Sequence, residues 1–483
     1  MFKRSLCIIL SLSILCFTGC SSVENLTFEE LMEEVNAKHQ EVEAVDVNVS
    51  DYIGDLVDDE QRNQYYLNNT QEKYDPEKVL TQQQAIEDVI YLFDAFHDCY
   101  GPYEYFGGTK VFDAAEEKIK EELQKKESIK SADFEQLLLQ QLRFVKDGHF
   151  KINMKCPNPT KVPFFFRETA FRKTKNGYQN TDGKQVKSVE GYENLDEIMK
   201  RSLSKEGELV YYPVLLKDCD FWDALETPQT CDETLTIHYT NGETEELEAE
   251  PYQIYTETSI ENPEKNKIVR AWEDGEIPVF QLNMFDKKHR DSILTGARKL
   301  REAPVSILDL RSNTGGDSEI PREWMEQYTK KFVLGHKTVI ATKNGRNTKM
   351  SDTEEIWAEN DKLLIILAGK YSASAAEWLL DLAYNVENVL IVGENTLGGT
   401  IGGSSKISLP NSACQVDIGS GHLSLFPEEE GYMEELRGLY PDIWVPAGEA
   451  EDLVPRFLEH YGVRKAKIIK ISWISKFLKI HLI

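Results

Sequence analysis

Apolar residues recur at intervals of three and four positions between residues 81 and 144. The first series is Ile86, Val89, Ile90, Phe93 and Phe96, and the second is Phe112, Ala115, Ile119 and Leu123. This spacing puts apolar side chains on one face of a helix. With a third helix expected from Ser131 to about Phe144, the pattern predicts a helical cap domain over residues 81–150.

Between residues 151 and 270, the apolar residues recur at shorter intervals. Residues 234–247 alternate between apolar and polar positions around Asn241-Gly242, a strong signal for a β-hairpin. A strand and turn are expected over residues 187–194, followed by a helix near Leu195 to Leu203. The order of elements is similar to a degenerate PDZ-like domain.

From residue 271 to 450 the pattern alternates between strand and helix. Buried strands are expected at 279–284, 305–310, 337–342, 363–368 and 389–393, with helices at 291–300, from Pro321, and at 374–384. Pro321 suits the first turn of a helix. Such alternation predicts an α/β core whose site lies at loops that leave the carboxyl ends of strands.

The first twenty residues have the pattern of an export signal. Lys3 and Arg4 precede an apolar run from Leu6 to Phe17 that is too short to span a bilayer comfortably. The Thr-Gly-Cys sequence ending at Cys20 resembles a bacterial lipobox, in which Cys20 becomes the lipidated first residue. The alternatives are an ordinary secretory signal or a short membrane anchor.

Two segments flank the predicted domains. Residues 21–80 are acidic and weakly periodic, so we expect a tether with one short helix at most. Residues 451–483 form a tail whose part from Arg464 to Ile483 is basic and apolar. That part is either an amphipathic contact to anionic lipid or an element that completes the core.

The composition argues against a nucleic-acid partner, a disulfide framework and a metal site. The formal charge of -28 disfavours nucleic acid as a partner. Three of the eight cysteines fall in residues 1–20, and the other five are too few for a disulfide framework, although one pair such as Cys219 and Cys231 stays open. No zinc-ligand spacing is present, so we expect no metal.

Two segments offer the parts of an oxyanion site. Ser374 follows a buried strand and opens an apolar helix, where the N–H of Ala375 can stabilise a negative oxygen. The same Ser-Ala-Ala-Glu sequence also fits a helix capping box. Gly315 and Gly316 follow another strand, and they are either oxyanion donors or a tight turn.

Two further segments contain candidate acids and bases. His149 lies in Lys-Asp-Gly-His, where the helical pattern ends, and an imidazole with an unperturbed pKa of about 6.5 suits a general base. Residues 434–446 form a turn into a last strand, and an acid such as Glu435 there is by default a surface charge.

Together the four segments resemble the tail-specific, or C-terminal-processing, serine peptidases and the related tricorn core proteases. The motifs that carry the resemblance are residues 309–316 (Asp-Leu-Arg-Ser-Asn-Thr-Gly-Gly), 372–377 (Ser-Ala-Ser-Ala-Ala-Glu), 393–398 (Gly-Glu-Asn-Thr-Leu-Gly) and 438–443 (Gly-Leu-Tyr-Pro-Asp-Ile). The resemblance implies a crotonase-like α/β core with a helical cap and a PDZ-like insert. It also implies Ser374 as nucleophile, and Ala375 and Gly316 as the oxyanion hole.

One departure separates the two branches of this family. The processing peptidases use a lysine as base after the Gly-x-x-Thr-x-Gly stretch, and here that position is Gly399. The resemblance to the tricorn branch instead implies His149 as base and Glu435 as the distal carboxylate. That branch has a bridging serine where this chain has Gly148, so Glu435 acts directly, through water or not at all, and Asp147 is a rival for orienting the base.

The expected function is therefore that of an exported serine endopeptidase without metal or organic cofactor. Its partners are a protein or peptide substrate and the outer face of a bacterial cytoplasmic membrane, reached through the lipid on Cys20. The main alternative is a binding protein that holds a peptide or apolar ligand in the same cleft without cutting it. A non-peptidase acyl hydrolase would use the same serine.

Overall fold

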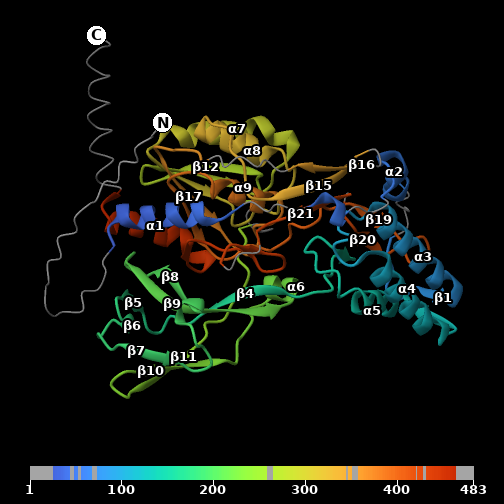
Figure 1. The fold of residues 1–483 in the computed structure, drawn as a ribbon, viewed down its shortest axis with the longest axis horizontal. Coiled ribbons are helices and arrows are strands. Elements are labelled where there is room, and N and C mark those ends of the chain that lie inside the picture. The colour runs from blue at the N-terminus through green and yellow to red at the C-terminus, as the bar shows by residue number, and fades with distance from the viewer. Residues whose placement is uncertain are drawn as a thin grey trace, which may run out of the picture.

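A computed structural model describes residues 26–43, 48–52, 56–67, 73–257, 265–343, 346–350, 357–419, 421–427 and 431–463 (Figure 1). The predictions for Cys20 and for the segment Arg464 to Ile483 lie outside these residues. The helices are α1 (Phe28–Glu41), α2 (Asp59–Leu67), α3 (Gln82–Cys99), α4 (Gly108–Gln124), α5 (Ser131–Gln141), α6 (Phe221–Glu226), α7 (Arg290–Glu302), α8 (Ile320–Thr329), α9 (Ala375–Ala383) and α10 (Ala450–His460). None of these described helices is long and apolar enough to cross a membrane.

The largest sheet contains both the β-rich segment and the later α/β segment. Its order is β12-β13-β14-β17-β18-β24-β8-β9-β5-β6, and β4 pairs with β9. The strands are β12 (Val269–Asp274), β13 (Ile277–Leu282), β14 (Val305–Asp309), β17 (Leu363–Ala368), β18 (Val389–Gly393), β24 (Ile443–Trp444), β8 (Met199–Leu203), β9 (Leu209–Cys219), β5 (Phe171–Thr174), β6 (Gly177–Asn180) and β4 (Thr160–Phe165). From β13 to β8 the strands run parallel, so the loops that leave β14, β17 and β18 meet at one edge.

Helices cover both faces of the parallel part of this sheet. Alternate strand residues such as Leu308 and Ile366 pack with α7, α8 and α9 on one face, and Ile307 and Ile365 pack with α1 and α10 on the other. Figure 1 shows α7 and α8 above β12 and β17, and α1 below these two strands. The result is a mixed α/β fold, as the alternating pattern predicted.

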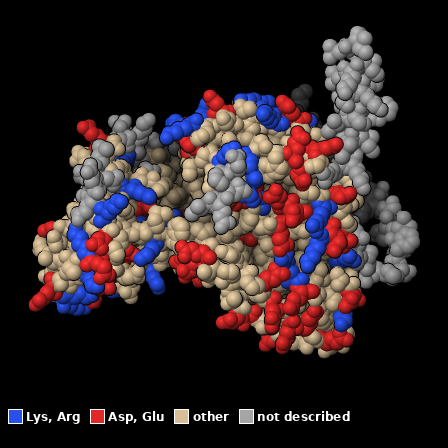
Figure 2. All heavy atoms as spheres, turned by 180° about the vertical axis from the view of Figure 1, so that it is seen from behind, with Lys and Arg blue, Asp and Glu red and all other residues tan. Residues whose placement is uncertain are grey.

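The β-rich segment contains the predicted hairpin. Strands β10 (Thr234–Tyr239) and β11 (Thr244–Glu248) pair in antiparallel fashion, and β10 also pairs with β7 (Val186–Val189). Figure 2 shows acidic side chains gathered over the end of the molecule that contains these strands. The helix expected over 195–203 is wrong: a short 3₁₀ turn, Leu195–Glu197, leads into β8. Pairing of β8 with β9 and β24 overrides its local helical pattern.

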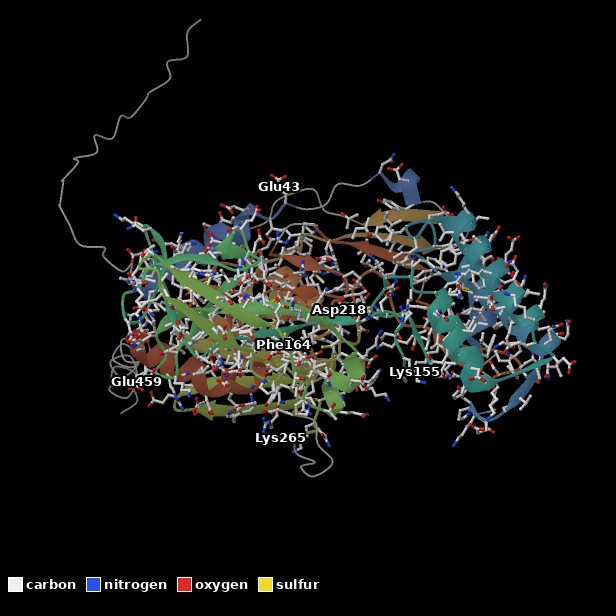
Figure 3. The ribbon with its side chains drawn as sticks, turned by 90° about the horizontal axis from the view of Figure 1, so that it is seen from below. Glu43, Lys155, Phe164, Asp218, Lys265 and Glu459 are labelled. Carbon is white, nitrogen blue, oxygen red and sulfur yellow. The ribbon has the colours of Figure 1, made fainter. Side chains whose placement is uncertain are left out.

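The three helices predicted between residues 81 and 144 are present as α3, α4 and α5. They share an apolar core with strands from the far end of the chain, β19 (Lys406–Ser408) and β20 (Gln415–Asp417), and with β3 (Lys151–Ile152). The segment 271–450 is therefore not one compact block, because residues 406–418 pack on the helices. In Figure 3 the segment around Lys155 lies between these helices and β4.

Part of the segment expected as a tether is packed into the core. Leu31, Met32 and Val35 of α1 are buried against the sheet, and α1 also brings His39 onto Asp442. The two side chains are fully buried, and Nε2 of His39 lies 2.9 Å from Oδ1 of Asp442. Residues 28–41, expected as part of a tether with one short helix at most, instead form a 14-residue helix packed on the sheet, because its apolar face is buried even though the segment is acidic.

Candidate active site

Ser374 lies in a sharp turn between β17 and α9. Its φ of 55° and ψ of −117° fall in a region that is costly for a residue with a side chain. Its main-chain N–H donates to Oε2 of Glu377 at 2.8 Å. Ser374 is partly exposed, whereas Ala373 and Ala375 on either side are buried, so the turn presents its hydroxyl group outward.

The glycine turn after β14 packs directly against this serine. The N–H of Gly315 donates to Oδ1 of Asn313 at 2.8 Å, and the carbonyl of Asn313 accepts from Ala373 N at 2.9 Å. Within the described chain, the N–H groups of Ala375 and Gly316 have no acceptor. Two unpaired donors therefore lie in the segments that surround Ser374, as an oxyanion site requires.

His149 is held by Asp147 rather than by Glu435. Its main-chain N–H donates to Oδ1 of Asp147 at 2.7 Å, and its ring Nδ1 lies 3.7 Å from the same oxygen. That Nδ1 is buried, and the described residues provide it with no hydrogen bond. Oδ2 of Asp147 accepts from the hydroxyl of Tyr100 at 2.8 Å, so a fully buried tyrosine from the end of α3 fixes the carboxylate.

His149 and the main chain of Ser374 both have contacts to the loop that contains Gly399 or to the carboxylate that holds it. The ring Cε1 of His149 lies 3.7 Å from the position that a Cβ on Gly399 would take. The N–H of Gly399 donates to the same Oε2 of Glu377 that accepts from Ser374, at 3.1 Å. The imidazole thus packs on a loop whose main chain shares the Glu377 carboxylate with Ser374.

Glu435 binds backbone beside the histidine. Its Oε1 accepts from Gly148 N at 2.7 Å, and its Oε2 accepts from Thr400 N at 3.0 Å and from the Thr400 hydroxyl at 2.9 Å. Burial, and then the charge of Asp147, hold the pKa of Glu435 well above its usual range, although the amide donors lower it. Glu435 thus positions the loop on which His149 packs, and its oxygens contact main-chain amides rather than the ring.

The absence of a side chain at Gly148 has a steric cause. A Cβ there would lie 2.6 Å from the carbonyl oxygen of Gly398 and 2.8 Å from Cα of Gly399. The loop that carries Gly399 therefore occupies the place where a bridging serine would stand.

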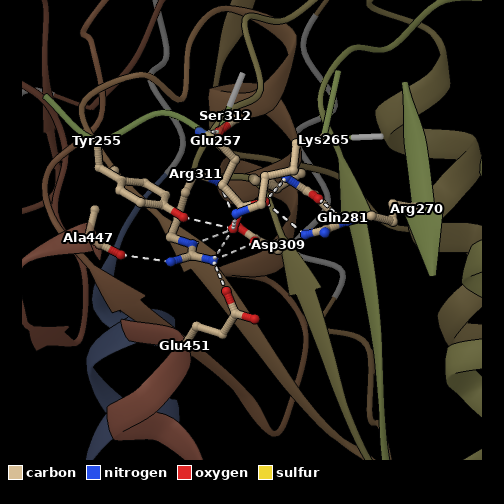
Figure 4. Close-up of polar contacts among 12 residues, drawn as sticks. Tyr255, Glu257, Lys265, Arg270, Gln281, Asp309, Arg311, Ser312, Ala447 and Glu451 are labelled. Atoms are coloured by element: carbon tan, nitrogen blue, oxygen red, sulfur yellow. Dashed lines mark hydrogen bonds and ion pairs between the residues drawn. The ribbon is translucent and has the colours of Figure 1, made fainter. Parts of the chain in front are cut away.

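A cluster of carboxylates near the glycine turn has the spacing of a metal site. Ligand atoms of Glu257, Asp309 and Glu451 lie within 4.8 Å of one another. Arg311 lies among them, donates to both oxygens of Asp309 at 2.9 and 2.7 Å, and reaches Glu451 at 2.9 Å (Figure 4). The cluster is thus an ion-pair network that anchors the end of β14, just before the glycine turn.

A cleft of about 710 Å³ opens beside the site. Phe106 and Phe144 line it from the helical region, and Thr400, Glu435 and Tyr440 line it from the α/β region. Ser374 and His149 are not part of its lining, which includes Glu435.

The family comparison agrees with this geometry. Residues 276–445 match the family model described as peptidase family S41. This segment is therefore similar to the S41 peptidases. It contains Gly316, Ser374 and Glu435, while His149 precedes it.

Curated relatives of the S41 segment are processing proteases. A carboxyl-terminal-processing protease of Picosynechococcus is 26% identical over 169 residues, which are 33% of this chain and 38% of that protein. One from Synechocystis is 32% identical over 124 residues, 24% of this chain and 27% of that protein. The chain thus spans well under half the length of these relatives.

The solved structures that resemble this chain have low sequence identity and TM-scores below 0.5. Mature CPAF in complex with lactacystin is 12% identical with a TM-score of 0.39, covering 80% of this chain and 98% of that one. The photosystem II D1 C-terminal processing protease is 14% identical with a TM-score of 0.35, covering 76% and 94%. The tricorn protease is 12% identical with a TM-score of 0.35, covering 77% and 35%.

Two polar residues of the site were not predicted from the sequence. Tyr100 contacts Asp147 from a helix end, and Lys370 is fully buried four residues before Ser374. A lysine between Gly369 and Tyr371 resembles a surface turn, so its sequence context gave no sign of burial. All five cysteines of the described chain are free thiols, so Cys219 and Cys231 do not pair.

Proposed function

We propose that the protein is an exported, membrane-anchored serine endopeptidase that hydrolyses peptide bonds through an acyl-enzyme. The observation that carries the proposal is the strained turn at Ser374 together with the unpaired amides of Ala375 and Gly316. Ala375 is buried, so its unpaired N–H costs free energy unless a ligand accepts from it, whereas Gly316 is exposed and its N–H is open to a ligand. A tetrahedral intermediate would supply that acceptor.

In the proposed reaction, His149 accepts the proton of Ser374 as Oγ attacks the substrate carbonyl carbon. The carbonyl oxygen becomes negative and accepts from Ala375 N and Gly316 N, each donor contributing about 3 kcal/mol to lowering the barrier. His149 then returns the proton to the leaving amine. Water, activated by the same imidazole, hydrolyses the ester on Ser374.

We assign the orientation of the base to Asp147. Its Oδ1 faces Nδ1 of His149, which leaves Nε2 for the serine, and a small ring movement would convert the 3.7 Å contact into a hydrogen bond. Tyr100 fixes the other oxygen, and Glu435 keeps the loop in place. In this arrangement Asp147 performs the task that the bridging serine and distal glutamate share in the tricorn-like branch.

The finer architecture forms part of the same proposal. The α/β region would be a crotonase-like core, residues 151–270 a PDZ-like insert and α3 to α5 a helical cap. Lipid on Cys20 would hold the enzyme at the outer face of the cytoplasmic membrane, and the substrate would be a protein or peptide.

The test is the variant Ser374→Ala with a fluorophosphonate probe and an unfolded protein substrate. The wild type should carry one adduct on Ser374 and cleave the substrate, and the variant should do neither while keeping its melting temperature. Thr81→Ala is the matched control, because Thr81 caps α3 with a hydrogen bond to Gln84 N and lies away from the site. If Ser374→Ala resembles Thr81→Ala, losing stability but not activity, Ser374 is only a cap. A wild type that takes no probe and cuts nothing would favour the binding protein.

A further inference from the structure

The proposed mechanism leaves one buried ionisable group unused. Lys370 is 0% exposed and lies on the turn that carries Ser374. Its Nζ donates to three main-chain carbonyl oxygens: Thr396 at 2.6 Å, Leu397 at 3.1 Å and Arg437 at 3.2 Å. An ammonium group has three N–H donors, and all three are used.

The loop that Lys370 holds is the one that separates Ser374 from His149. Glu377 grips the next residues of the same loop: its Oε1 accepts from Gly398 N at 2.7 Å and its Oε2 from Gly399 N at 3.1 Å. Lys370 thus binds the carbonyls and Glu377 binds the amides, and both side chains come from the turn and helix around Ser374.

This arrangement sets the distance between nucleophile and base. The far side of the loop packs on the histidine segment, with Gly399 against Cε1 of His149 and Gly398 against Gly148. A shift of the loop relative to Ser374 would therefore move the imidazole. Displacements of about 1 Å in a catalytic site cost on the order of 100-fold in rate.

We propose that Lys370 is a positioning residue that, with Glu377, clamps loop 396–399 and thereby sets the separation of His149 from Ser374. This inference rests on the proposed function for its catalytic consequence only. Lys370 is not itself the base, because its three donors point to carbonyls and none of its hydrogen bonds reaches Ser374.

The clamp needs the charged amine. A neutral amine has two N–H groups and a lone pair, which would face the third carbonyl unfavourably. Burial lowers the pKa of Lys370 to about 7, while Glu377 and Glu394 raise it and Arg437 lowers it. The clamp should accordingly weaken as pH rises through the titration of Lys370.

The experiment compares the wild type with Lys370→Met, which keeps an unbranched side chain of nearly the same length and removes its donors. Two measurements are made: the rate at which fluorophosphonate labels Ser374, and amide hydrogen exchange of residues 393–400. We expect at least a tenfold slower labelling rate and faster exchange at Gly398 and Gly399. Val454→Ala, in the core under α10, is the control for stability, and it should lower the melting temperature without changing either measurement.

Each outcome bears on a different statement. Unchanged exchange in folded Lys370→Met overturns the clamp, whether or not the enzyme reacts with the probe. Faster exchange with an unchanged labelling rate overturns the link to catalysis. A wild type that takes no label refutes the proposed function alone. If Lys370→Met does not fold, hydrogen exchange of the wild type is measured from pH 6 to pH 9 and corrected for the intrinsic exchange rate. We expect the protection of Gly398 and Gly399 to fall as pH rises. Protection that stays constant overturns the clamp.

Discussion

The side chain of Ser374 fills the space in which a side chain on Gly315 would begin. A Cβ on Gly315 would lie 2.7 Å from Cβ of Ser374 and 2.8 Å from the carbonyl oxygen of Ala373. The glycine turn at Gly315 and the serine turn are therefore in direct contact.

Gly315→Ala should disrupt both turns. The added methyl group clashes with the main chain of the serine turn, and the φ of 93° at Gly315 is itself unfavourable for alanine. We expect a loss of about 2 kcal/mol or more in the free energy of unfolding, measured by urea titration, and loss of probe labelling. Gly242→Ala is the control, because Gly242 has a φ of 89° with open space around it. Equal effects of the two variants would mean that contact with Ser374 is unimportant.

Gly148 and Gly399 should respond differently to alanine. A Cβ on Gly148 meets main-chain atoms at 2.6 and 2.8 Å, whereas a Cβ on Gly399 has no neighbour closer than 3.5 Å. Gly148→Ala should therefore lower the free energy of unfolding by about 1–3 kcal/mol. Gly148→Ser should be no more active than the wild type. Gly399→Ala should unfold at nearly the wild-type urea concentration. A stable and more active Gly148→Ser would show that the loop leaves room for a bridging serine.

Asp147→Asn and Glu435→Gln separate the two carboxylates. If Asp147 orients the imidazole, Asp147→Asn should have a kcat that is roughly 100-fold or more lower than that of the wild type, with a smaller change in KM. In Glu435→Gln, an NH₂ group replaces one carboxylate oxygen and cannot accept the hydrogen bonds that this oxygen accepts from main-chain amides. The main effect should therefore be a lower melting temperature. Full activity in Asp147→Asn together with an inactive but stable Glu435→Gln would reverse the assignment. Steady-state kinetics on a peptide substrate measures both.

The features of the fold and of the site that could be predicted from the sequence are those with strong local signals. The apolar spacing of α3 and α4, the turn at Asn241-Gly242 and the glycine pair before Asp317 each reflect a constraint on nearby residues. Ser374 and His149 were assigned through motifs, and the structure brings their segments together around Gly399.

The features that sequence did not predict depend on contacts between distant segments. Strand β8 forms because β9 and β24 offer it partners, and α1 is packed because the sheet has an uncovered apolar face. Lys370 and Tyr100 have ordinary neighbours in the sequence. Only the folded chain shows that Lys370 donates to the carbonyls of Thr396 and Arg437, and that Tyr100 donates to Asp147. Local patterns carry no information about such pairings.

Arg311→Met should test the ion-pair network that holds the end of β14. Arg311 is buried with Asp309, so its removal leaves a buried carboxylate without its partner, at a cost of about 3–5 kcal/mol. Arg290→Met is the control: Arg290 also makes a two-pronged contact with a carboxylate, Glu323, but the pair is exposed to solvent and salt. Urea titrations of both variants measure the difference. Equal stability of the two variants would contradict a structural role for the buried network.

The contact between α1 and the last strand should appear in the pH dependence of stability. Burial alone would raise the pKa of Asp442, but the facing His39 outweighs it and lowers that pKa below its usual value. A carboxyl group whose folded pKa is depressed stabilises the protein above its unfolded pKa of about 3.9, and this contribution disappears as pH falls through the folded pKa. Asp442→Asn should therefore be less stable than the wild type at pH 7, and its stability should fall less steeply between about pH 4 and pH 2. Asp381, which also has a lowered pKa, is present in both proteins and gives them a common background slope. Urea titrations across this range measure both slopes, and parallel curves would mean that the pair between His39 and Asp442 does not contribute to acid stability.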